Sequence, residues 1–480
     1  MRRRASNPAR AVTVAADRAA PAGSVAGREA ARVVALSGLG GALEFYDFIV
    51  YGVFASYIGQ TFFPAGDALT SLLATFAVFG AGYLARPLGG LLFGRRADLR
   101  GRRGSFMLSL AIMSLATAAM GLVPSYAAWG PAATVLFVAL RLIQGVCVGG
   151  ELPGAITYAA EIVSPRRATL ACGLVFGCVG AGVLLATGVS AGLHALLPAP
   201  AMAAWGWRVA FVFGGLLGGL GWLLRRGLAE SPAYLALAHS GRQERAPVRA
   251  VVRAHAGAVL CGVLSTAVVG VVNGLLFAHM PAYLVRVLGY APRDVAAAMS
   301  ACVTVQSLGL VAGCWLAERT GRLGIYRAGC ALIALGAVPA YAALAAHAAP
   351  LPVLLALVGL GASLTHGTFA ALLADLFPAG VRSTGVGIAL NAGALLSGAA
   401  PVLATVLLAW FGWAASPGVL VVAAAVLGLV ATAWVPRHAG HLAARPGDAP
   451  GVASGIAPGT SSASAGPPSA GSAPTRCLSR

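Results

Sequence analysis

The sequence predicts an all-α polytopic membrane protein, and three observations favour this fold class. Of the 480 residues, 59% are hydrophobic and only 10% are charged, which is far too apolar for a soluble domain of this length. Twelve apolar segments, each long enough to cross a bilayer core of roughly 30 Å, follow one another along the chain. A weak internal repeat divides them into two sets of six. We therefore expect twelve transmembrane helices in two pseudo-symmetric six-helix bundles.

The expected spans cover residues 31–58, 69–93, 105–123, 132–160, 168–197, 207–224, 255–283, 294–316, 325–347, 351–374, 383–411 and 417–435. A polar stretch with six arginines separates the sixth span from the seventh, and Ser231-Pro232 within it is a typical helix start. After Arg437 the composition turns to Gly, Pro, Ser and Ala, which cannot bury enough apolar surface to fold. The expected organisation is a cytoplasmic leader, a six-helix bundle, a central cytoplasmic loop, a second bundle and a disordered cytoplasmic tail: 1–30, 31–224, 225–254, 255–436 and 437–480.

Arginine alone supplies the positive charge, since the chain contains no lysine, and the net charge is +19. Of the 33 arginines, 28 fall on one side of the expected spans and three on the other, while Arg86 and Arg141 lie within spans. This asymmetry follows the positive-inside rule, so both termini are expected in the cytoplasm and the protein in a bacterial inner membrane. The same distribution argues against nucleic acid as a partner and favours contact of the arginine runs with lipid head groups.

Two acids lie inside the first span, in the stretch GALEFYDFIVYG from Gly41 to Gly52. Glu44 and Asp47 are three residues apart and so share one helix face, which can look into the protein rather than into lipid. Because an ionisable residue at this depth costs roughly 2.5 kcal/mol or more, the acids indicate movement of an ion or a substrate. The alternative is a buried ion pair that only fixes helix packing.

An acid-x-x-Gly-Arg pattern follows the second span and returns 220 residues later after the eighth, beginning at Asp98 and at Glu318. The fourth and tenth spans likewise end in an acid followed by Pro and Arg. We expect these groups to close a cytoplasmic gate. Alternatively, the arginines there only set the orientation of the spans in the membrane. The predicted gate residues are Asp98, Arg102, Glu161, Glu318, Arg322 and Asp375.

Six motifs occur in the order and at the spacing of a known family: GALEFYDFIVYG, LARPLGGLLFG, GRRADLRGRR, RLIQGVCVGGE, AESPAY and ADLFPAGVRSTG. From about Arg32 to Pro436 the chain resembles the metabolite:proton symporter family of the major facilitator superfamily. FASYIGQTFFPA and TFAVFGAGYLARP are most similar to citrate and tricarboxylate carriers. Other members carry dicarboxylates, shikimate, proline or betaine. The resemblance implies the major facilitator fold, alternating access and a proton as the coupling ion, with no cofactor and no metal.

Two departures from the family pattern bear on the site. Ala97 and Leu99 flank Asp98, where the family has Gly before the acid and Arg after it. The fourth span has Pro153 close to Glu151, where the family often has Gly. A proline there predicts a kink beside the acid, so the identity of the substrate does not transfer directly from the family.

In facilitator-type transporters the first, fourth, seventh and tenth spans line the central cavity, and here these spans carry the polar groups. Asp47 and Arg141 lie at similar depth, so we expect an ion pair in which Asp47 holds Arg141 when ionised and releases it when protonated. Glu44 and Glu151 are further candidates for proton coupling, and Glu151 could instead be a helix-packing group. Glu44 could either tune Asp47 as a like charge or contact the solute.

The predicted substrate-binding residues are Arg86, Arg141, Gln144, Asn273, His279 and His366. A guanidinium suits a carboxylate because it donates two parallel hydrogen bonds. Arg86, which we expect about two turns from the cytoplasmic end of its span, could instead extend toward the interface or brace a helix. A lone histidine in a span is, however, more often a packing residue with its hydrogen bonds satisfied.

The function that the sequence favours is proton-coupled symport of a small organic acid such as citrate, a tricarboxylate or a dicarboxylate, by a monomer in the lipid bilayer. Uptake of a zwitterion such as proline or betaine, drug-type antiport and a transport-inactive membrane sensor are the alternatives. No enzyme constellation is present. Glycine pairs such as Gly145 and Gly149 are spaced as helix contacts rather than as a phosphate-binding loop.

Overall fold

The computed structural model describes residues 27–64, 68–241 and 243–438. Most of the predicted leader, and the predicted tail beyond residue 438, lie outside these residues. Within them every regular element is helical, and twelve helical segments are long and apolar enough to cross a membrane. The predicted all-α fold with twelve spans is confirmed for the part of the chain that the structure describes.

Helices of the first half precede residue 226: α2 (Gly27–Val53), α3 (Ala55–Phe62), α4 (Ala68–Arg100), α5 (Arg102–Leu122), α6 (Tyr126–Trp129), α7 (Pro131–Ile162), η1 (Pro165–Arg167), α8 (Ala168–Gly177), α9 (Val179–Leu196), α10 (Ala199–Ala201), η2 (Met202–Gly206) and α11 (Trp207–Arg225). The predicted central loop contains two short helices, α12 (Pro232–His239) and α13 (Pro247–Ala254). As the sequence predicted, Ser231 begins α12, because its hydroxyl accepts a hydrogen bond from the backbone amide of Tyr234.

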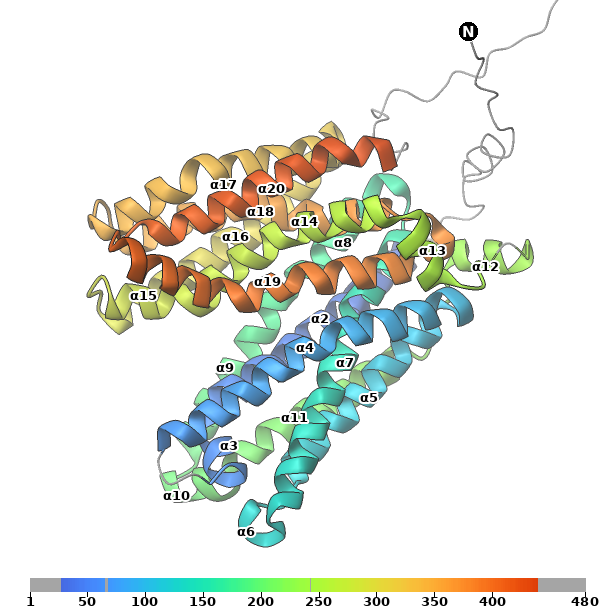
Figure 1. The fold of residues 1–480 in the computed structure, drawn as a ribbon. Coiled ribbons are helices and arrows are strands. Elements are labelled where there is room, and N and C mark those ends of the chain that lie inside the picture. The colour runs from blue at the N-terminus through green and yellow to red at the C-terminus, as the bar shows by residue number, and fades with distance from the viewer. Residues whose placement is uncertain (1–26, 65–67, 242, 439–480) are drawn as a thin grey trace, which may run out of the picture.

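Helices of the second half follow: α14 (Ala256–Asn273), η3 (Gly274–His279), α15 (Met280–Arg286), α16 (Pro292–Thr320), α17 (Arg322–Ala345), α18 (Leu351–Asp375), η4 (Ala379–Val381), α19 (Arg382–Phe411) and α20 (Ser416–His438). Figure 1 shows two groups of helices, one containing α4, α5, α7 and α11 and the other α14 to α20, with α8 packed against α16 and α18 and with α12 and α13 together at one end. We refer to this end, where α4 and α11 end and α19 begins, as the arginine-rich end. The seventh span is continuous through a π-helical turn, η3, a distortion that is frequent at functional sites.

Close helix contacts in the first half depend on small residues, as the glycine spacing predicted. A Cβ atom at Gly145 would lie 2.2 Å from the carbonyl oxygen of Gly82, and one at Gly149 would lie 1.9 Å from that of Arg86. Only glycine permits such an approach, so α7 packs directly on the backbone of α4. This places the polar side chains of α4 and α7 beside one another.

Contact between the two halves at the arginine-rich end also uses glycine. A Cβ atom at Gly90 of α4 would lie 2.5 Å from the carbonyl oxygen of Gly387 on α19, and the reverse contact is 2.6 Å. One turn further along α4, a Cβ atom at Gly94 would lie 2.8 Å from the carbonyl oxygen of Ser383. Backbone therefore meets backbone where α4 crosses α19, and no space is left between the halves at that crossing.

Both repeated motifs lie on helices, although the sequence placed them in loops after spans ending at 93 and 316. Helix α4 continues to Arg100 and α16 continues to Thr320. Each is broken by a glycine with positive φ, Gly101 at 106° and Gly321 at 100°. Glycine adopts this backbone conformation without strain, so the next helix can begin at once. Near the ends of α4 and α16, Asp98 and Glu318 accept hydrogen bonds from backbone amides of the opposite half.

Candidate functional site

Inside the first half, α2, α4, α5 and α7 enclose a small cavity. Its walls include two carboxylates and two guanidiniums, which come from different helices. The lining residues are Glu44, Asp47, Gly82, Tyr83, Arg86, Met113, Arg141, Gln144, Gly145 and Val148. Five residues that the sequence singled out from three spans are therefore brought to one place: Glu44, Asp47, Arg86, Arg141 and Gln144.

Glu44 has a partner that the sequence analysis did not assign. Its carboxylate lies 3.6 Å from the guanidinium of Arg86, and both side chains are buried. Arg86 also donates a hydrogen bond of 3.4 Å to the side chain of Asn391 on α19. Because α4 runs to Arg100, Arg86 lies fourteen residues before the end of its helix rather than about two turns. It therefore does not extend to the interface, which corrects that expectation.

Asp47 and Arg141 are connected through two intermediate side chains instead of the expected direct ion pair. The Thr117 hydroxyl donates to the Asp47 carboxylate at 2.7 Å, and the Gln144 amide donates to the Thr117 hydroxyl at 2.6 Å. Arg141 in turn donates to the Gln144 carbonyl oxygen at 3.0 Å. The result is a continuous chain of hydrogen bonds from guanidinium to carboxylate. Thr117 belongs to α5, a span that the sequence analysis did not expect to line the cavity.

Arg141 is held from its other side by aromatic rings. Its guanidinium carbon lies 4.4 Å from the ring centroid of Tyr51 and 5.0 Å from that of Phe79. Contacts of this type stabilise a cation that has left water. Tyr51 of the GALEFYDFIVYG motif and Phe79 of α4 thus help to position the arginine of α7.

Glu151 pairs with Arg225 at 3.5 Å, and both side chains are completely buried. Arg225 also donates two hydrogen bonds, of 2.8 and 2.5 Å, to the carbonyl oxygen of Leu36 on α2. The sequence analysis placed Arg225 in the central cytoplasmic loop. It is instead the last residue of α11, and its side chain enters the protein because Glu151 and a backbone carbonyl neutralise and satisfy it.

In the second half, the structure brings two of the three predicted substrate residues together. His366 Nε2 of α18 lies 2.9 Å from the Asn273 side chain at the end of α14, and both histidine nitrogens have partners. His279 lies apart from this pair, stacked on Tyr283 with ring centroids 5.4 Å apart. Its Nδ1 is buried without a hydrogen-bond partner, so the alternative of a packing residue with satisfied hydrogen bonds fits His366 rather than His279.

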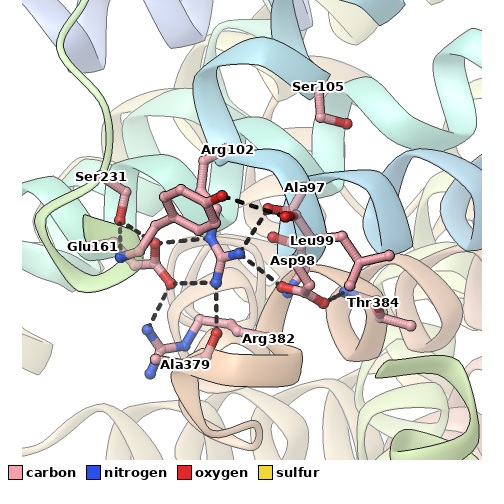
Figure 2. A network of polar contacts seen from close by, with 12 residues as sticks. Ala97, Asp98, Leu99, Arg102, Ser105, Glu161, Ser231, Ala379, Arg382 and Thr384 are labelled. Carbon is pink, nitrogen blue, oxygen red and sulfur yellow. Dashed lines mark hydrogen bonds and ion pairs between the residues drawn. The ribbon is translucent and has the colours of Figure 1, made fainter. Parts of the chain in front are cut away.

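At the arginine-rich end, Glu161 accepts hydrogen bonds from three groups (Figure 2). Arg102 lies 3.2 Å away, Arg382 of the second half lies 2.9 Å away, and the Ser231 hydroxyl donates at 2.5 Å. The predicted gate acid is thus bound simultaneously by the first half, the segment between the halves and the second half.

Asp98 makes a further set of contacts between the two halves of the protein (Figure 2). Its carboxylate pairs with Arg102 at 2.9 Å and accepts hydrogen bonds from the backbone amides of Ser383 and Thr384, at 3.2 and 2.8 Å. These amides open α19, where a helix has unsatisfied N–H groups and a partial positive charge. Arg102 adds a hydrogen bond of 2.5 Å to the carbonyl oxygen of Ala379.

A related arrangement exists in the other half but with weaker burial. Glu318 accepts a hydrogen bond of 3.0 Å from the backbone amide of Leu170 near the start of α8, as Asp98 does at α19. Arg322 pairs with Asp375 at 2.5 Å. The side chains of this pair are 20% and 23% exposed, compared with 2% and 0% for Arg102 and Glu161. The internal repeat is therefore visible in three dimensions, and its first copy is the buried one.

Four functional candidates escaped the sequence analysis for different reasons. Asn391 and Thr117 are polar residues in spans that are not expected to face the cavity. Arg225 is the first of several arginines that follow the sixth span, so its position in the sequence did not distinguish it from them. Arg382 was noted only as part of a motif. A search for every polar residue within the spans would have found the first two.

The described geometry can be compared with known proteins. The sequence profile of the Major Facilitator Superfamily matches residues 37–401, and a second, overlapping match covers residues 262–467. The chain belongs to the Major Facilitator Superfamily. The citrate-proton symporter of Klebsiella pneumoniae is 33% identical over 402 residues, which cover 83% of this chain and 90% of that protein.

Other members of this superfamily are also similar. The proline/betaine transporter of Salmonella typhimurium is 30% identical over 83% of this chain and 82% of its own length. Among solved structures, the proton:xylose symporter XylE superposes with a TM-score of 0.68 at 19% identity, over 85% of this chain and 96% of that one, which confirms the fold. The predicted resemblance to metabolite:proton symporters is confirmed, and this superfamily member is a multi-pass membrane transporter rather than an enzyme.

Proposed function

We propose that this transporter carries a small organic carboxylate together with protons, by alternating access, across the bacterial inner membrane. The observation that carries the proposal is the cavity in which Glu44, Asp47, Arg86 and Arg141 face one another. Guanidiniums bind carboxylates well, and buried acids inside a span are positions at which protons bind and leave.

The charges in this cavity connect proton binding to anion binding. When Glu44 and Asp47 are ionised, their two negative charges balance the two positive charges of Arg86 and Arg141. Protonation of either acid leaves a guanidinium with less compensation, so a carboxylate solute becomes the favourable counter-charge. At Asp47, loss of the charge also weakens the charge-assisted hydrogen bond from Thr117 and with it the chain that holds Arg141. Binding of the proton therefore prepares the site for the anion.

Contacts between the two halves support a state that is closed at the arginine-rich end. By the positive-inside rule the arginine-rich end faces the cytoplasm, with both termini on that side. There Asp98, Glu161 and the glycine crossing of α4 with α19 join the halves, so a solute in the cavity has no path to the cytoplasm. Opening requires these polar contacts to break, and each is worth little once water can replace it.

Uptake of a zwitterion such as proline or betaine is a second candidate. Two carboxylates in one cavity could pair with a cationic amine while a guanidinium binds the acid group. The similarity to proline/betaine transporters favours the same possibility. For an anion, by contrast, the acids must be neutral when the solute binds.

Uptake into proteoliposomes distinguishes the two candidates. Purified protein is reconstituted and supplied with radiolabelled citrate, succinate, proline or betaine, with and without an inward proton gradient. We expect accumulation of a carboxylate that requires the gradient and collapses when a protonophore is added. Accumulation of betaine or proline alone would replace the first proposal by the second, and uptake that ignores the gradient would contradict proton coupling.

A further inference from the structure

A second cavity lies at the arginine-rich end, away from the transport site. It is formed by α13 and by the last turns of α4, and four arginines surround it. The lining residues are Arg95, Arg245, Ala246, Val248, Arg249, Val252 and Arg253. In Figure 1, α13 lies beside α12 at this end, where the segment between the halves enters the second half. No residue of the network around Glu161 contributes to it.

The arginines of α13 are arranged as a stripe. Arg249 and Arg253 of α13 are four residues apart and lie on one face of the helix, and Arg245 lies two residues before the helix begins. Like charges at this spacing destabilise an isolated helix. All three side chains are exposed, and Arg95 of α4 faces the same cavity. The stripe and Arg95 therefore bring four positive charges to one cavity, which favours an anion there.

No carboxylate supplies that compensation in the part of the chain that the structure describes. The ion pairs recorded there involve other arginines, and none includes Arg95, Arg245, Arg249 or Arg253. Glu244 is the nearest acid in sequence, and its carboxylate accepts a hydrogen bond of 3.0 Å from the backbone amide of Ala246. It thus contributes to the start of α13 rather than to an ion pair with the stripe.

Part of the cavity wall is apolar, and α4 carries exposed leucines on the turns before Arg95. Val248 and Val252 form the apolar part of the wall, and Val252 is 58% exposed. On α4, Leu88 and Leu92 are about half exposed on the turns that precede Arg95. Since exposed leucines on a spanning helix face hydrocarbon, Arg95 marks the level at which the acyl region ends and the head groups begin.

We propose that this cavity binds the head group of an anionic phospholipid, with the phosphate among Arg95, Arg249 and Arg253 and the start of an acyl chain along Val248 and Val252. The combination of a cationic rim with an apolar floor at the membrane boundary fits a lipid better than a soluble anion, which would leave the apolar wall uncovered. The proposal does not depend on which solute the transporter carries.

Native mass spectrometry of the full-length protein in detergent tests this, with dioleoylphosphatidylglycerol titrated against dioleoylphosphatidylcholine. We expect tighter binding of phosphatidylglycerol, weakened about 25-fold in the R249Q/R253Q variant because each arginine near a membrane surface contributes about fivefold. R95Q, on the other helix, should weaken binding about fivefold by itself. The variant R166Q/R167Q is the matched control, because it removes two exposed arginines of η1 at the same end and should leave binding unchanged.

Three results would overturn the proposal. Equal binding of the zwitterionic and the anionic lipid would remove the role of charge. If R166Q/R167Q weakened phosphatidylglycerol binding as much as R249Q/R253Q, the net charge of the protein rather than this cavity would determine lipid binding. Displacement of the lipid by inorganic phosphate in micelles would assign the cavity to a soluble anion. Because α13 lies on the surface and R95Q tests a different helix, misfolding of one variant would not conceal the answer.

Discussion

At the scale of single residues, each acid that the sequence placed deep in a span has a partner from a different helix. Glu44 faces Arg86, Asp47 accepts from Thr117, and Glu151 pairs with Arg225. None of these partners could be identified by spacing along one helix. The three acids nevertheless differ, since only Glu44 and Asp47 line the cavity, whereas Glu151 joins α7 to α2 and α11.

The variant D47N should separate proton coupling from transport. A neutral amide keeps the shape of the side chain but cannot bind and release a proton, so we expect gradient-driven accumulation to fall about tenfold or more. Exchange of labelled for unlabelled solute at equal pH should persist. D294N is the matched control, since Asp294 is exposed in the first turn of α16. Normal gradient-driven accumulation by D47N would contradict the assigned role.

The buried pair of Glu151 and Arg225 should act mainly on stability. Removal of one partner leaves the other charge buried without compensation, which costs about 3 kcal/mol or more in free energy of unfolding. We expect R225Q to be strongly destabilised and the double variant E151Q/R225Q to recover most of the loss. Denaturation followed by tryptophan fluorescence in detergent measures both. If the double variant were as unstable as R225Q, the hydrogen bonds of Arg225 to Leu36 would be the main contribution instead.

At the scale of elements, small residues and helix ends determine how the two halves meet. The crossing of α4 and α19 has no room for a side chain at Gly90, and each half offers an acid to the start of a helix in the other half. Asp98 binds the first amides of α19, and Glu318 binds one near the start of α8. These contacts are lost together when the end opens, which favours a two-state change.

Substitution of Gly90 by Leu should prevent closure of this end. Overpacking of a close contact costs about 1 to 3 kcal/mol, which changes the ratio of closed to open states about 5- to 150-fold. We expect slower uptake and faster amide hydrogen exchange at the start of α19. G336L is the control, because a Cβ atom at Gly336 on α17 meets nothing within 4 Å. Unchanged amide hydrogen exchange in G90L would indicate that the crossing of α4 and α19 accommodates the leucine side chain without opening.

At the scale of the whole molecule, the two halves share a repeat but divide the chemistry between them. The first half holds the paired acids and guanidiniums of the cavity, whereas the second contributes Asn273, His366 and Asn391, which carry no permanent charge. The buried network at the arginine-rich end also belongs chiefly to the first half. Under the proposed function, the candidate proton-binding acids therefore belong to one half.

The orientation of the molecule is open to a direct test. We expect alkaline phosphatase fused after Ala127, in the segment between α5 and α7, to be active because that segment lies outside the cytoplasm. A fusion after Ser240, between α12 and α13, should be inactive, because this segment lies at the arginine-rich end, which we expect in the cytoplasm. The opposite pattern would reverse the orientation and with it the assignment of the closed end to the cytoplasm.

The sequence by itself determined the number of spans, their order and the repeat, because hydrophobic length and motif spacing are local properties. It also identified five of the ten residues that line the cavity, including all four charged ones. Only the tertiary structure decided their partners: Arg86 for Glu44, Thr117 for Asp47 and Arg225 for Glu151. A buried charge is compensated by whichever group the packing of helices brings within reach. The spacing of residues along one helix does not determine the distance to a partner on another helix.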